Sequence, residues 1–307
     1  MLRNRRKPTA SFPIRMTLLA AAIAICAADA RAQSSEDFTD ASGQVTVRIY
    51  TGPEVTGEIN NTTVSVDTDF VLVGGGAEVE GMGSPGALLT ASYPDQNLTT
   101  WHASSKDHIL TYSHKLRAYA IGLRLAGVSS TQLRSYMVLV TQNSGTGEHV
   151  SAVAALPPGY LLVGGGGRAN WSTAGLLLTE SYPNAFQWVA SAKDHWITEY
   201  GSVDSFAIGI TSGTIPGFGS LSVNYNSAVT WANSGYGVAD VTVPTGWVLS
   251  SVGGQAQYNG QGRMLCQLVP YVDPPTYSRP GGLAMSKDHY KYDSGYTTAF
   301  AVAISKK

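Results

Sequence analysis

The chain is poor in charged residues and in cysteine. Only 13% of its 307 residues are Asp, Glu, Lys or Arg, and it has two cysteines, Cys26 and Cys266. An apolar fraction of 43% beside so few charges excludes a disordered chain. The 34 glycines follow no three-residue period, which excludes a collagen-like chain. No window of a dozen residues sustains an apolar stripe at helical spacing, so we expect a turn-rich β protein.

The first 32 residues have the pattern of an export signal. A basic start is followed by the apolar stretch Met16 to Ala28, whose 13 residues are too few to span a bilayer. The small residues Ala30 and Ala32 place the expected cut before Gln33. We therefore expect a secreted or periplasmic protein. No later apolar stretch is long enough to cross a membrane, so the product is not expected to span one.

Removing the signal changes the charge balance. It holds six of the 20 basic and one of the 21 acidic residues, which leaves 14 basic and 20 acidic residues and a net charge of −6. A nucleic-acid partner would need a basic face, so none is expected. Cys266 is then the only cysteine, so no intramolecular disulfide can form. Its apolar neighbours indicate a buried thiol rather than a nucleophile.

Short motifs recur three times along the chain, about 90 residues apart, and indicate a tandem repeat. An apolar strand running into glycines occurs at Phe70 to Gly76, Tyr160 to Gly166 and Trp247 to Gly254, and a strand ending in proline occurs at Leu88 to Pro94, Leu177 to Pro183 and Met264 to Pro270. The predicted organisation is a signal at 1–32, a flexible N-terminal segment at 33–44, and β repeats at 45–126, 135–212 and 219–305.

The alternation of apolar and polar residues predicts about five short strands in each repeat. We expect an all-β fold in which three tandem repeats of antiparallel strands form a pseudo-threefold, β-prism-like assembly. Three small β-sandwiches in a row are the alternative. Glycines weaken an apolar strand unless another backbone approaches closely, so we expect the glycine strands to meet near the axis. The threefold strand pattern resembles β-prism lectins in architecture alone, and fold analogy is weak evidence of function.

A Lys-Asp-His motif ends the fourth strand of each repeat and takes three of the six histidines. The residues are Lys106, Asp107 and His108, then Lys193, Asp194 and His195, then Lys287, Asp288 and His289. Strand alternation predicts that each Asp points inward and anchors the following turn, while Lys and His point outward. Outward histidines on different sheets would lie far apart. The Lys and His pairs would then form up to three shallow sites that donate hydrogen bonds to a glycan.

A three-histidine metal site is the rival interpretation of this motif, and it requires the histidines to converge. The expected geometry predicts no metal and no other cofactor. The spacing of Asp67 and Asp69, and of Glu78 and Glu80, would suit a catalytic carboxylate pair, but a solvated strand edge explains it equally. Six aromatic residues have Gly, Asn or charged neighbours and could stack on a sugar: Trp171, Trp196, Tyr200, Tyr258, Tyr290 and Tyr292.

Secretion, threefold repetition and low charge together favour a noncatalytic, lectin-like protein whose partner is an extracellular glycan or polysaccharide. Repetition would raise avidity if several weak sites engaged one polymer. One alternative is a secreted polysaccharide hydrolase or lyase whose site occupies a single repeat. For that enzyme we would look first at the third repeat, which diverges most. Another alternative is a structural or adhesive surface protein.

Overall fold

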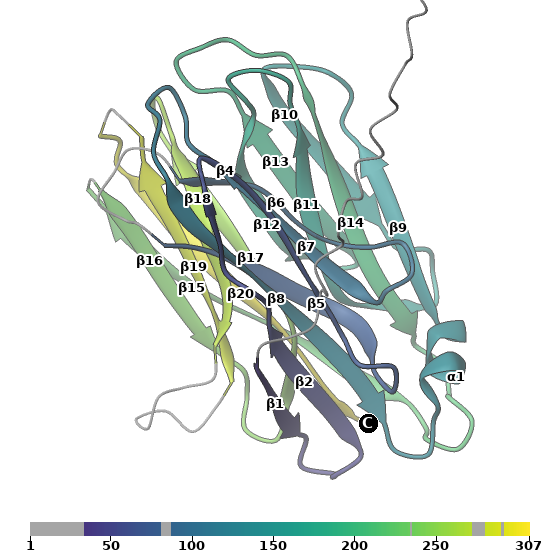
Figure 1. The fold of residues 1–307 in the computed structure, drawn as a ribbon. Coiled ribbons are helices and arrows are strands. Elements are labelled where there is room, and N and C mark those ends of the chain that lie inside the picture. The colour runs from purple at the N-terminus through teal and green to yellow at the C-terminus, as the bar shows by residue number, and fades with distance from the viewer. Residues whose placement is uncertain (1–33, 81–86, 234, 272–279, 290–291) are drawn as a thin grey trace, which may run out of the picture.

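The computed structural model describes residues 34–80, 87–233, 235–271, 280–289 and 292–307. These residues form three antiparallel β-sheets and one short helix (Figure 1). The all-β prediction is therefore confirmed. The signal segment 1–32 lies outside the described residues.

The first sheet has the strand order β1-β2-β8-β5-β18-β19-β16, and β3 also pairs with β8. Its strands are β1 (Ser34–Thr39), β2 (Val45–Thr51), β3 (Val55–Gly57), β8 (His114–Leu125), β5 (Val71–Glu80), β18 (Arg263–Tyr271), β19 (Gly281–Asp288) and β16 (Tyr236–Thr242). Strand β1 lies in the segment 33–44, which was expected to be a flexible N-terminal segment.

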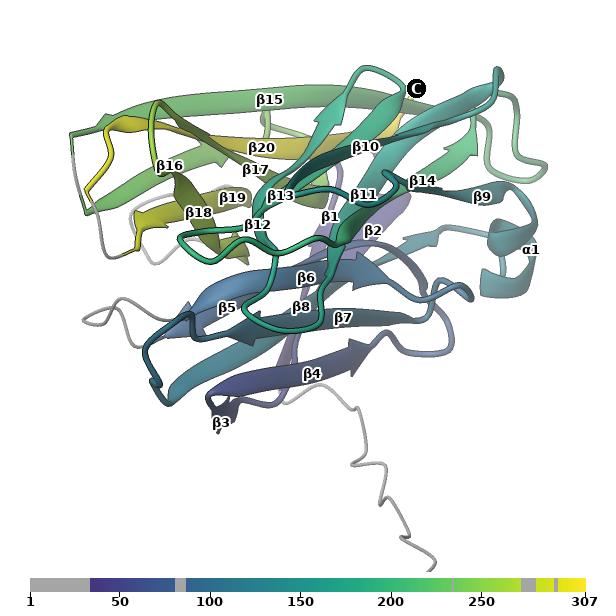
Figure 2. The same ribbon diagram turned by 90° about the horizontal axis from the view of Figure 1, so that it is seen from above.

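The second sheet has the order β4-β7-β6-β11-β14-β9, and the third has the order β10-β13-β12-β17-β20-β15. The second contains β4 (Ile59–Ser65), β7 (Thr100–Lys106), β6 (Leu88–Pro94), β11 (Tyr160–Asn170), β14 (Ser202–Thr211) and β9 (Met137–Asn143). The third contains β10 (His149–Ala155), β13 (Gln187–Lys193), β12 (Leu177–Asn184), β17 (Val248–Tyr258), β20 (Gly295–Lys306) and β15 (Leu221–Ala232). Figure 2 shows β15 and β20 on one side of the molecule and β4 and β7 on the other.

Each sheet combines strands from two of the segments 45–126, 135–212 and 219–305. The two halves of the first sheet meet where β18 pairs with β5 over Gln267 and Leu268, and the other two sheets are joined by equally short pairings. Because the segments share their sheets, they do not form separate sandwiches. The second and third segments contribute six strands each, not the five expected, since β10 and β16 had not been foreseen.

The glycine strands β5, β11 and β17 pack against one another in the interior. Each has a bulge at the same place in its pairing, just before Gly74, Gly164 and Ser251 respectively. A Cβ atom added to Gly164 would clash with the carbonyl oxygen of Val73, and one added to Gly74 would clash with that of Ser250. The expectation that these glycines permit close backbone approach is confirmed.

Two buried tryptophans each pack over the next glycine of a glycine strand that belongs to another sheet. Trp101 lies on Gly75 and Trp188 on Gly165, and a Cβ atom on either glycine would enter the indole ring. Each indole also donates a hydrogen bond of 3.0 Å to a buried serine hydroxyl. Buried indoles thus have their polar atom satisfied, as a dry core requires.

The helix α1 (Ser130–Ser135) lies at the boundary between the segments 45–126 and 135–212, where no strand was predicted. The Ser129 hydroxyl caps it by accepting a hydrogen bond of 3.2 Å from the Gln132 amide, and Leu133 anchors it in the core. A short polar segment is helical here because one cap and one buried leucine suffice to fix a single turn.

Candidate functional site

The structure brings the three motif histidines together. Their ring centroids are 5.6 Å apart for His108 and His195, 5.0 Å for His108 and His289, and 5.1 Å for His195 and His289. The three residues follow the ends of β7, β13 and β19, one strand from each sheet. The expectation that the histidines would lie far apart is therefore wrong.

The predicted outward orientation of lysine and histidine is also wrong. The six side chains are only 0–5% exposed, whereas the three aspartates are half-buried. Lys106 does lie on the opposite face from Trp101, as alternation requires. That face is covered, however, by the loop that follows β11, in which Gly175 packs against the Lys106 side chain. A covering segment about 70 residues away in the chain reverses the burial expected from alternation.

The lysines hold these covering loops by their backbone. Lys106 Nζ donates to the carbonyl oxygens of Thr173, at 3.1 Å, and of Ala174. Lys193 Nζ donates likewise to the carbonyl oxygens of Asp194, at 3.2 Å, and Gln261. Burial lowers the pKa of both amines, that of Lys193 to about 8.

The histidines link the loops to one another. His108 Nδ1 lies 3.0 Å from the Ala174 carbonyl oxygen, and its Nε2 contacts the carbonyl oxygen of His195. His195 repeats the arrangement, with Nδ1 3.1 Å from Gln261 O and Nε2 2.8 Å from His289 O. A neutral imidazole carries one hydrogen, so it can donate through only one of its two nitrogens at a time.

Burial keeps the rings of His195 and His289 uncharged near neutral pH. It lowers the pKa of His195 to about 4, with help from the charge of Lys193, and that of His289 to about 3, with help from the neighbouring histidines and lysines. Within the described ranges, no group of three His, Cys, Asp or Glu side chains is arranged to hold a metal ion. The ring nitrogens of His108 and His195 face backbone carbonyl oxygens. They are therefore engaged in hydrogen bonds and are not arranged to bind a metal ion.

The motif aspartates make contacts of the kind expected of turn anchors. Asp107 accepts a hydrogen bond of 3.1 Å from the Tyr112 amide, and Asp194 accepts one of 3.4 Å from the Glu199 amide. Asp288 differs, since it accepts from the Gly235 amide at 2.7 Å and pairs with buried Arg263 at 3.2 Å.

The turns after the first two motifs are strained and carry exposed apolar side chains. Ile109 and Trp196 have φ values of 64° and 63°, a region that costs a non-glycine residue on the order of 1–3 kcal/mol. In each turn the amide two residues after the histidine donates to the histidine carbonyl at 2.7 Å. The buried histidines thus fix the backbone from which these side chains project.

A surface hollow of about 460 Å³ lies beside the second of these turns. Its walls are formed by Ala169, Asn170, Trp171, Ser172 and Tyr200. The Tyr200 side chain is 66% exposed, while the Trp171 ring lies 4.2 Å from Lys106 Nζ. The structure thus brings together two of the aromatic residues suggested by the sequence. Tyr290 lies outside the described residues.

Glu199 shapes this hollow and was missed in the sequence. Its carboxylate accepts hydrogen bonds from the amides of Ser172, Thr173 and Gly175, at 2.5–2.9 Å. Burial alone would raise its pKa, but these donors lower it to about 2. Asp293 accepts from Gly260 and Gly262 in the same way. The available signal was an acidic residue five positions after the motif aspartate, which occurs after two of the three motifs.

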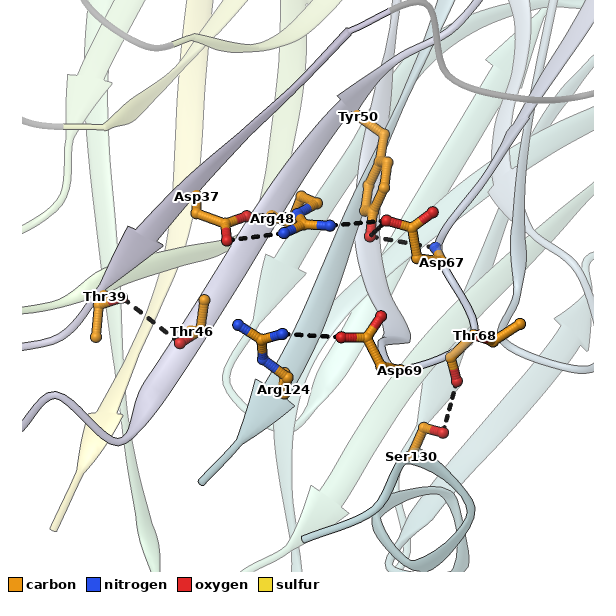
Figure 3. A network of polar contacts seen from close by, with 10 residues as sticks. All are labelled: Asp37, Thr39, Thr46, Arg48, Tyr50, Asp67, Thr68, Asp69, Arg124 and Ser130. Carbon is orange, nitrogen blue, oxygen red and sulfur yellow. Dashed lines mark hydrogen bonds and ion pairs between the residues drawn. The ribbon is translucent and has the colours of Figure 1, made fainter. Parts of the chain in front are cut away.

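The carboxylate pairs considered from the sequence lie in ion-pair networks. In Figure 3, Arg48 bridges Asp37 and Asp67, and Arg124 pairs with Asp69 at 2.8 Å. Glu78 and Glu80 both contact Arg117 at 3.4 Å. All four carboxylates are thus engaged by arginine side chains.

Cys266 is buried, and burial raises the pKa of its thiol to about 12. It is therefore protonated near neutral pH and cannot act as a nucleophile.

The described part of the chain has no helix long and apolar enough to span a membrane. The sequence matches no protein-family model, and no curated protein matches it.

Proposed function

We propose that the chain is an exported, noncatalytic protein that binds carbohydrate through aromatic rings at its surface. The observation that carries the proposal is the hollow in which Trp171 and Tyr200 lie beside the side chains of Asn170 and Ser172. Aromatic rings pack on the apolar face of a sugar, while amide and hydroxyl groups bind its hydroxyls. Aromatic side chains with a few polar groups placed beside them are typical of ligand sites.

In this proposal the motif lysines and histidines are positioning residues. Lys106 and His108 both contact the Ala174 carbonyl oxygen and so fix the loop that carries Trp171. Lys193 and His195 fix the loop after Tyr258 through Gln261. The direct donation to a glycan that the sequence suggested would require these buried groups to leave their carbonyl partners, so we assign the glycan contact to the aromatic rings instead.

We further propose that the three segments are copies of one β unit around a pseudo-threefold axis, as in a β-prism. Strand order supports this, because one half of each sheet reads β2-β8-β5, β9-β14-β11 or β15-β20-β17, and the other half reads β18-β19-β16, β6-β7-β4 or β12-β13-β10. The matching bulges and the meeting of the three histidines agree with it.

The sites on such units would differ. Tyr258 occupies the position of Trp171, counted from the bulge, and its ring lies 5.0 Å from Lys193 Nζ. The matching position in the first segment, 81, lies outside the described residues. We therefore place the strongest site at Trp171 and Tyr200.

Replacing Tyr200 by alanine is expected to weaken glycan binding about tenfold or more, because a stacked ring contributes about 1.4 kcal/mol or more to binding. A glycan array identifies the ligand, and titration calorimetry with that ligand compares the proteins. Phe186→Ala is the matched control, since Phe186 is 55% exposed but lies outside the hollow. Equal loss in both variants, or no binding to any glycan, would overturn the proposal.

A polysaccharide hydrolase or lyase is less well supported by the described residues. Asp67, Asp69, Glu78 and Glu80 all contact arginine. Burial raises the pKa of the Asp288 carboxyl, but this group is paired with Arg263. Such an enzyme would need a general acid that is protonated and lies in an open cleft.

Export with cleavage before Gln33 is part of the proposal. Expression of the full chain in a bacterium with an ordinary export pathway should give a periplasmic or secreted product that begins at Gln33, read by intact-mass spectrometry. A product that keeps the first 32 residues, or stays in the cytoplasm, would contradict this.

A further inference from the structure

The outer face of the third sheet exposes aromatic rings on neighbouring strands. Two rows of side chains cross β12, β17, β20 and β15 on this face, and a third row crosses β17, β20 and β15. Strands β15 and β20 lie at one side of the molecule in Figure 2. The rows are Tyr182, Gly253, Phe300 and Ser227; then Glu180, Gln255, Thr298 and Val229; then Gln257, Tyr296 and Trp231. Tyr296 is 45% exposed, whereas its neighbours on β20 that point inward, Thr297 and Ala299, are buried.

The rings form two pairs on this face. Trp231 and Tyr296, which are 44% and 45% exposed, meet edge to face with centroids 4.6 Å apart, and the half-buried rings of Tyr182 and Phe300 stack at 4.9 Å. Since Tyr296 and Phe300 are four residues apart on one strand, the pairs lie about 13 Å apart. That separation exceeds a single sugar ring and would suit several units of a chain.

Amide and hydroxyl groups fill the space between the ring pairs. Gln255 donates to Glu180 at 2.9 Å, and Gln257 donates to Gln255 at 3.3 Å. Thr298 lies directly opposite Gln255 on β20. The three rows, all within described strands, contain one carboxylate, Glu180, and no basic side chain.

The other two sheets carry ion pairs at the positions that correspond to Gln255 and Thr298 of the third sheet, counted from the β-bulge. In the second sheet Arg168 pairs with Asp204 at 2.6 Å, and its guanidinium lies 5.1 Å from the ring of Tyr93. In the first sheet Glu78 faces Arg117 across the strands. A neutral ligand would have to desolvate these charges, which is costly. In the third sheet the same positions hold Gln255 and Thr298, whose groups can bind hydroxyls at little cost.

We propose that the outer face of the third sheet binds a linear, uncharged polysaccharide. Successive sugar rings lie on the Trp231–Tyr296 pair and on the Tyr182–Phe300 pair, and their hydroxyls bind Gln255, Gln257 and Thr298. The inference rests on the proposed carbohydrate binding and adds the class of ligand, a neutral chain rather than a single terminal sugar. The lack of basic groups in the three rows fits an uncharged polymer, because an acidic one would meet Glu180 without a counter-charge.

The test is affinity electrophoresis of the purified protein in gels that contain hydroxyethyl cellulose, glucomannan, mixed-linkage β-glucan or, as an acidic polymer, polygalacturonate. We expect retardation by at least one neutral polymer and none by polygalacturonate. The double variant Trp231→Ala/Tyr296→Ala should raise the dissociation constant at least tenfold. Tyr236→Ala is the matched control, because this tyrosine is 39% exposed on a strand of the first sheet. Thermal unfolding of each variant checks that it folds.

Other outcomes separate this inference from the proposed function. Unchanged retardation in the double variant, together with its loss in Tyr200→Ala, would overturn the outer-face site and leave the hollow. Binding to array glycans without retardation by any neutral polymer would also overturn the inference alone. Binding to no saccharide would overturn both. A dimer in sedimentation velocity that dissociates in the double variant would assign the face to a second copy of the chain and overturn the inference.

Discussion

Gly164→Ala lowers the stability of the protein by about 3 kcal/mol or more, or prevents folding, because the added methyl group has no space. A Cβ atom at this position would clash with the Val73 carbonyl oxygen and with Ser251, and these atoms belong to the two other glycine strands. Backbone atoms in a packed centre cannot rotate away as a side chain can, so the cost exceeds ordinary overpacking of 1–3 kcal/mol. Urea unfolding followed by tryptophan fluorescence measures the effect.

Gly213→Ala is the control for this substitution. Gly213 lies between β14 and β15, and the nearest atom to an added Cβ would be the Thr211 hydroxyl at 3.4 Å. Its free energy of unfolding is expected to stay within about 0.5 kcal/mol of the original protein. An unfolding midpoint for Gly164→Ala close to that of the control would show that the glycine strands do not meet as described.

The second large effect is a loss of stability in mild acid. The folded-state pKa values of His195 and His289, about 4 and about 3, lie below the unfolded value of about 6.5. Between these values the unfolded chain binds more protons, so stability falls as the pH falls through this window. At pH 5 each of the two histidines is expected to cost about 2 kcal/mol. The charges that face the rings, those of Lys193 and Lys287, reinforce the effect.

The variant His195→Asn separates this effect from general acid sensitivity. Asparagine does not titrate, and its amide can donate to one of the two carbonyl oxygens that His195 contacts. We expect this variant to be less stable than the original protein at pH 7.5 but to lose less stability between pH 7.5 and pH 5. Urea midpoints at both pH values give the comparison. Equal losses in both proteins would contradict a role for His195 in the pH dependence.

The fold class was accessible from the sequence because its evidence is local. Alternation of apolar residues marks strands such as β2 and β9, and the glycine runs that enter β5 and β11 mark positions where backbones meet. Strands β10 and β16 were missed because they lie at sheet edges, where exposed residues alternate with small ones such as Ala152 and Ala154. A weak apolar pattern at an edge resembles a loop.

The candidate site was harder to predict from the sequence, because contacts between residues far apart in the chain determine its geometry. Alternation placed Lys106 correctly opposite Trp101, but only the structure shows that Thr173 and Ala174 cover that lysine. The rings on the third sheet were missed for a related reason. Trp231 and Tyr296 lie 65 residues apart in the sequence, and their pairing depends on a register that no local pattern reveals.

The most direct test of the proposed function is a crystal structure of the protein grown with the tightest-binding saccharide from the array. Our account predicts a sugar ring stacked on Tyr200 beside Trp171, with a sugar hydroxyl within hydrogen-bond distance of the Asn170 side chain. A saccharide bound elsewhere while the hollow holds only water would contradict it.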